Sequence, residues 1–112
     1  MNLELDFTYL NSICGGDEEF IQDILQTFMD EMPKDMQTMR NAIDHGDVTM
    51  AGKTGHKVKA TLHLLGLEEL KELAFNIEQA AKADSQDLSI LSWAEELIRQ
   101  MDLVYPKVQE KL

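Results

Sequence analysis

Apolar residues recur every three or four positions along almost the whole chain, and this periodicity most restricts its fold. Such spacing gathers apolar side chains on one face of an α-helix, whereas a half-buried strand requires strict alternation. No run of six positions alternates apolar and polar residues, and the β-branched residues are scattered. We therefore predict an all-α fold.

Breaks in the periodicity divide the chain into helices. A short opening helix is expected from about Asp6 to Ser12 or Cys14, ended by Gly15-Gly16. Four longer helices are expected after it, the first three capped or started near Asp17, Asp47 and Leu67 and the last capped by Asp87. Short connections make neighbouring helices antiparallel. The expected architecture is an antiparallel, up-and-down four-helix bundle with a short extra N-terminal helix, forming one domain over residues 1–112.

Two prolines fall inside predicted helices. Proline disfavours helical geometry in the residue before it but is tolerated in a first helical turn. Pro33 therefore marks either a kink or the start of a new helix, and Pro106 predicts a kink or an early end.

Composition limits which partners the chain can bind and in which cellular compartment we expect it. Twenty-one acids against ten Lys and Arg give a formal charge of −11, so nucleic acid and anionic membranes are disfavoured partners. No apolar run approaches the ~20 residues of a membrane span. One cysteine excludes an internal disulfide and a thiolate metal site, and acids near the N-terminus disfavour a signal peptide. We expect a cytoplasmic protein.

The stretch between Asp47 and Glu68 departs from the acidic character of the chain. Its twenty residues contain no acid, and they include three lysines and two histidines: Lys53, His56, Lys57, Lys59 and His63. This is the segment best suited to an anion.

A helical wheel places His56 on the outside of this segment. Ala51, Gly55, Val58, Leu62 and Leu65 group within roughly 40° of one line, which we assign to the core. On that wheel His56 lies about 140° away, Ala60 about 180° and Lys53 near 200°, with Lys59 at the flank near 80°. The imidazole should therefore project into solvent from the middle of a rigid helix.

An exposed histidine is usually a solvated residue without a role, but three features favour a site here. This segment is positively charged, whereas the chain as a whole is negatively charged. Small residues (Gly52, Gly55 and Ala60) are frequent in it, although glycine destabilises a helix. The flanking lysines disfavour a second positive charge and so favour a neutral imidazole. A neutral ring with ammonium groups nearby is suited to accept a phosphoryl group.

Residues 56–66, HKVKATLHLLG, resemble the signature of histidine-containing phosphotransfer (HPt) domains. In that family an apolar residue follows the histidine by two positions, a lysine by three and a glycine by about ten. Further similarity covers nearly the whole chain: Phe7 to Leu10, Gly15-Gly16-Asp17, Phe20 to Pro33, Gly46-Asp47 and Leu67 to Ala81. One departure is Ala60, where the family usually has glycine; its extra methyl could slow transfer or narrow partner choice.

The resemblance implies a phosphorelay intermediate that exchanges a phosphoryl group reversibly with receiver domains. His56 would be the phospho-acceptor through its outer ring nitrogen, and Lys59 would balance the phosphoryl charge with Lys57 as a weaker helper. Glu78 aligns with a polar side chain that meets the inner ring nitrogen. Ala60 and Lys53 complete the expected contact surface.

The implied partners are response-regulator receiver domains and a hybrid sensor histidine kinase. No cofactor or metal is expected on this chain, because the divalent metal belongs to the acidic pocket of the receiver. The chain has no glycine-rich phosphate loop, so we expect a phosphocarrier without autonomous kinase activity.

Other interpretations stay open at this point. His56 and His63, two turns apart, could ligate a metal, but no Glu-x-x-His pair accompanies them and the lysines repel cations. A non-catalytic helical adaptor of the same fold would dock receivers or kinases without being phosphorylated. A homo-oligomeric bundle is a third possibility, although we expect a monomer. A methionine stripe from Met29 to Met39 fills the core or forms a partner groove, and Leu64 is either covered by the N-terminal helix or part of a docking patch.

Overall fold

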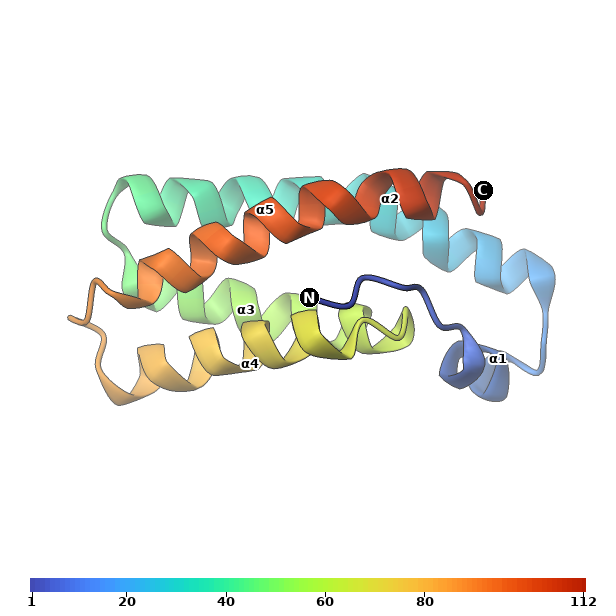
Figure 1. The fold of residues 1–112 in the computed structure, drawn as a ribbon, viewed down its shortest axis with the longest axis horizontal. Coiled ribbons are helices and arrows are strands. Elements are labelled where there is room, and N and C mark those ends of the chain that lie inside the picture. Colours follow the sequence, from blue (N-terminus) through green and yellow to red (C-terminus); the bar gives the residue numbers. More distant parts are fainter.

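The computed structural model describes residues 1–112 and consists of five helices without a strand. The helices are α1 (Thr8–Cys14), α2 (Glu18–Asp44), α3 (Val48–Leu64), α4 (Glu68–Ala83) and α5 (Ile90–Gln109). Helices α2 to α5 run along the long axis of the molecule, and α1 lies at one end (Figure 1). The predicted all-α bundle with an extra N-terminal helix is confirmed.

Aspartate caps set two of the helix starts as predicted. The side chain of Asp17 accepts a hydrogen bond from the Phe20 amide, and that of Asp47 accepts one from the Met50 amide. The predicted Asp87 cap of α5 is wrong. Asp87 instead accepts from the amide and hydroxyl of Ser89, which closes a turn before the helix, and α5 begins at Ile90.

Neither proline ends its helix. Helix α2 runs without interruption through Pro33, and its first turns are inclined to the rest of the helix in Figure 1. Of the two possibilities, a new helix at Pro33 is excluded. Helix α5 continues to Gln109 beyond Pro106, where burial of Val108 holds its last turn on the core.

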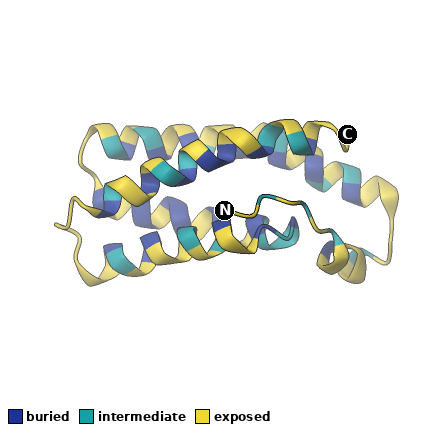
Figure 2. Ribbon diagram, in the orientation of Figure 1, coloured by how far each residue is buried: buried dark blue, intermediate teal, exposed yellow.

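Buried positions recur along α2 to α5 (Figure 2), and their apolar side chains form one core cluster. Met32, Met36 and Met39 are buried, so the methionine stripe fills the core. Leu64 is half-buried, packs against the core and borders a groove next to α2. None of the five helices combines the length and apolar character that crossing a bilayer requires.

Helices α3 and α4 approach each other closely because α3 carries glycine at the contact. A Cβ atom on Gly55 would lie 2.6 Å from the carbonyl oxygen of Ala74, and one on Gly52 would lie 2.6 Å from Cβ of Ala81. Both distances are far below van der Waals contact. Both glycines are buried at this contact, Gly55 on the predicted core face, so they serve the packing of the two helices.

The N-terminal segment is hydrogen-bonded to the turn between α3 and α4. The Asp6 amide donates to the carbonyl oxygen of Leu65 at 3.0 Å, and Gly66 occupies the left-handed region with φ +73°. A side chain on Gly66 would overlap the Asp6 backbone, so glycine is required there for both conformation and space.

The close contact predicts different outcomes for the two glycines. Gly52→Ala should destabilise the fold by about 1–3 kcal/mol, because overpacking outweighs the helix propensity of alanine. Adding Ala81→Gly removes the methyl group of α4 that the new side chain on α3 would overlap, and it should recover most of this loss. Gly55→Ala should be equally damaging but should not be rescued by a side-chain truncation on α4, since its methyl meets backbone. Urea unfolding measures the free energy of unfolding of the single variants and of the double variant. Additive effects of Gly52→Ala and Ala81→Gly would contradict the expected rescue.

Candidate functional site

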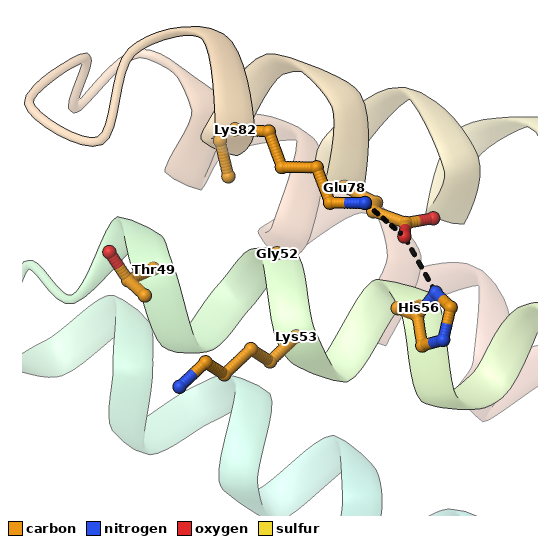
Figure 3. A pocket seen from close by; sticks show the side chains of 7 residues that line it. Thr49, Gly52, Lys53, His56, Glu78 and Lys82 are labelled. Carbon is orange, nitrogen blue, oxygen red and sulfur yellow. Dashed lines mark hydrogen bonds and ion pairs between the residues drawn. The ribbon is translucent and has the colours of Figure 1, made fainter.

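His56 projects outward from the middle of α3, as the helical wheel predicted. Its side chain is 65% exposed, and its Nδ1 lies 2.6 Å from Oε2 of Glu78 on α4. Figure 3 shows the ring with Nδ1 turned toward Glu78 and the second nitrogen turned away from α4. The outer nitrogen is therefore accessible while the inner one is held.

Glu78 is the buried partner in this arrangement, with only 3% of its side chain exposed. Lys59 Nζ lies 2.6 Å from Oε1, and Lys82 Nζ lies 3.1 Å from Oε2. The hydrogen bond from Lys59 is the main reason that the pKa of Glu78 falls from 4.5 to about 2, with burial opposing it and Lys82 and His56 assisting. Glu78 is consequently a carboxylate, which only accepts hydrogen bonds.

The charge state of Glu78 decides which nitrogen of His56 is nucleophilic. Because the carboxylate cannot donate, Nδ1 of the neutral imidazole must carry the proton and donate it to Glu78. The lone pair of the neutral ring then lies on Nε2, the accessible nitrogen.

Lys59 is fixed at the side of the site. Its side chain is 29% exposed, and its ammonium bonds to Glu78 and lies 5.2 Å from the centre of the Phe75 ring, a cation–π distance. These two contacts restrict the Lys59 side chain and place a positive charge beside the imidazole.

The remaining expected contact residues are placed differently. Lys57 forms an ion pair with Asp35 of α2 at 2.6 Å, so the structure directs it away from Glu78. Lys53 and Ala60 are exposed, and Figure 3 shows the Lys53 ammonium extending along α3 away from the ring. The structure thus brings together His56, Lys59 and Glu78, but not Lys57.

Sequence reasoning missed Lys82. It stands four residues after Glu78, a spacing that places the two side chains on the same face of a helix. That signal was available, because the resemblance already implied that Glu78 meets the inner ring nitrogen of His56.

His63 offers an internal comparison. Its Nδ1 lies 2.8 Å from Oε1 of Glu68, and its ring packs 4.5 Å from that of Tyr9 on α1. Glu68 is 54% exposed, so its carboxylate is solvated, whereas that of Glu78 is buried. No group of three or more His, Cys, Asp or Glu side chains is arranged to hold a metal ion.

A family comparison identifies the class of protein to which this site belongs. The model of the Hpt domain family matches residues 23–105, about three quarters of the chain. The chain belongs to the Hpt domain family. Hpt domains are phosphocarriers of two-component phosphorelays, where they interact with receiver domains and histidine kinases. The resemblance noted in residues 56–66 is thereby confirmed at the level of the family.

Two curated relatives are similar over most of this Hpt domain. They are the sensor protein EvgS of Escherichia coli O157:H7 and that of Escherichia coli strain K12, each 26% identical over 101 residues. The matched region covers 88% of this chain but 8% of each relative, so the chain corresponds to a small part of those proteins. No solved structure gives a significant match.

The lowered pKa of Glu78 predicts a specific loss of stability in acid. A carboxylate whose pKa is lower in the folded state stabilises the fold above its unfolded pKa, and this contribution disappears as the pH falls through the folded value. For Glu78 the window runs from 4.5 down to about 2. The expected contribution is on the order of 3 kcal/mol.

Urea unfolding at several pH values in this window measures the effect. The free energy of unfolding of Glu78→Gln should fall less steeply with acid than that of the wild-type chain. Glu69→Gln, an exposed change on the same helix, serves as the matched control. Equal slopes for the wild-type chain and Glu78→Gln would contradict the assignment.

Proposed function

We propose that His56 is the phospho-acceptor of this Hpt domain and exchanges the phosphoryl group reversibly with aspartates of receiver domains. The observation that carries the proposal is the orientation of one ring. Nδ1 is held by a buried carboxylate, and Nε2 is left accessible. An exposed histidine without such a partner would present either nitrogen.

The transfer balances without an additional reactant. The Nε2 lone pair attacks phosphorus, the N–P bond forms as the P–O bond to the receiver aspartate breaks, and the aspartate leaves as a carboxylate with the bonding electrons. The ring gains positive charge but loses no proton, because Nδ1–H stays bonded to Glu78. The buried negative charge of Glu78 stabilises that state most, since it lies against the inner nitrogen.

The reverse step restores the starting tautomer. A receiver aspartate attacks phosphorus, the N–P bond breaks and Nε2 recovers its lone pair while Nδ1–H remains in place. Lys59 offsets the charge of the phosphoryl group, because one of its three ammonium protons bonds to Glu78 and the others remain available. The divalent metal used in this chemistry belongs to the receiver, whose active pocket supplies most of the catalysis.

A non-phosphorylated adaptor of the same fold is the competing interpretation. Such an adaptor would still dock its partners, but it would not require an imidazole bound by a buried carboxylate or the two lysines that bond to this carboxylate. Labelling of the chain distinguishes the two, whereas binding does not.

The first test is labelling by a receiver domain charged with acetyl phosphate and Mg²⁺. We expect His56→Gln to abolish labelling, because glutamine keeps a polar side chain but lacks the nucleophile. His63→Gln should label like the wild-type chain, although His63 also has Nδ1 beside a glutamate. The label should be labile in acid and stable in base, as expected for phosphohistidine. Full labelling of His56→Gln would refute the site, and a wild-type chain that no receiver in a panel labels would favour the adaptor.

A second test separates the neighbouring lysines. Lys59→Ala should slow transfer by about tenfold or more, because a charge beside the reacting group is lost. Lys57→Ala should have a smaller effect, since Lys57 pairs with Asp35. Rapid-quench kinetics measure both rates, and circular dichroism shows whether the variants remain folded. Equal effects of the two changes would remove the proposed role of Lys59.

A further inference from the structure

A cleft of about 350 Å³ opens between α3 and α4 directly beside the His56–Glu78 pair. Its floor consists of Gly52 and Ala81, and the longer side chains of Lys53 and Lys82 border it (Figure 3). The hollow exists because the two helices meet there through their smallest residues, so nothing fills the space above them. We call it the Lys53–Lys82 cleft.

The charge of this cleft is not balanced within the chain. Glu78 is the only acid that lines it, and both of its oxygens already accept hydrogen bonds. Lys82 is 66% exposed and uses one donor toward Glu78. Lys53, unlike Lys57, Lys59 and Lys82, forms no ion pair. Around this cleft a chain of charge −11 therefore has an excess of positive charge, since Lys59 and Lys82 share one carboxylate and Lys53 has none.

Covering this cleft with a partner has an electrostatic cost. Any domain that brings an aspartyl phosphate to Nε2 must also cover the surface next to the ring. Removing Lys53, which has no counterion, and Lys82, which shares Glu78 with Lys59, from water is unfavourable, whereas pairing them with carboxylates is tolerated and orients the partner. Lys59 is less available for this purpose, because Glu78 and the Phe75 ring hold it.

We propose that the Lys53–Lys82 cleft is a partner-selecting subsite, which receives a carboxylate-bearing segment of the receiver domain that docks on His56. This inference rests on the proposed function, since it names the partner chemistry of the same site. Lys53 and Lys82 act in recognition and contribute to the encounter rather than to the chemical step. Receivers with acidic side chains at the matching position are favoured, and those with basic ones are rejected.

The experiment uses the receiver domain that labels the wild-type chain fastest in a panel. Transfer to Lys53→Ala, Lys82→Ala and the double variant is followed by rapid quench over a range of receiver and NaCl concentrations. The double variant should need up to about tenfold more receiver for half-maximal rate, which corresponds to two exposed ion pairs. Its rate should also depend less on salt. Lys111→Ala, which lies just beyond the end of α5 and removes one positive charge as each single variant does, should alter neither quantity.

Two further variants make the result decisive. Lys53→Glu should raise the half-saturating concentration more than Lys53→Ala, because it adds repulsion to the lost attraction. An unchanged half-saturating concentration and salt dependence in the double variant would overturn the subsite. So would an equal loss in Lys111→Ala, which would show that only total charge matters.

Binding measurements separate failure of the subsite from failure of the proposed function. Isothermal titration calorimetry with the unphosphorylated receiver measures its binding to His56→Gln, with and without the two lysine changes. It reports docking in the absence of transfer. Weaker binding of the lysine variants supports the subsite even if His56 is not the acceptor. Normal labelling of His56 with no effect of the lysines refutes the subsite alone.

Discussion

The approach of α3 to α4 determines both the packing and the chemistry of this domain. Two glycines on α3 bring its backbone against Ala74 and Ala81, where any larger residue would overlap its neighbour. This spacing lets Glu78 reach Nδ1 of His56 at 2.6 Å from the facing helix. If the helices stood apart by the width of a methyl group, the carboxylate would lose its contact with the ring. The cleft beside the ring has the same origin, because the residues that permit the approach are also too small to fill it.

Glu78 combines three roles that would otherwise conflict. A buried carboxylate is costly, and the chain offsets this cost with Lys59, Lys82 and the imidazole. The same contacts hold it ionised, which fixes the proton on Nδ1 and exposes the lone pair of Nε2. Its lysines in turn keep positive charge next to the carboxylate that holds the ring. The stability of the bundle and the orientation of the His56 ring thus both depend on a single ionised group.

Membership in the Hpt family and the geometry of the site answer different questions. The family match assigns the chain to the phosphocarriers of two-component systems. It does not distinguish His56 from His63, which also lies beside a glutamate. The structure separates them physically, since one glutamate is buried between lysines and the other is solvated. Partner choice, we infer, depends on the unpaired charge around the cleft rather than on the reactive ring.

The sequence by itself determined the helical architecture, the caps at Asp17 and Asp47 and the outward direction of His56. These features depend on residues near one another in the chain, so periodicity and capping chemistry suffice to predict them. Only the tertiary structure decided that α2 continues through Pro33, that Asp87 closes a turn instead of capping α5, and that Gly52 meets Ala81 while Gly55 meets the backbone of Ala74. It also turned Lys57 toward Asp35 and added Lys82 to the site. The contacts of Gly52, Gly55 and Lys57 join segments far apart in the chain, and local spacing carries no information about the distance between such segments. Asp87 and Lys82 contact residues only two and four positions away, and there the structure selected one of several contacts that local spacing allows.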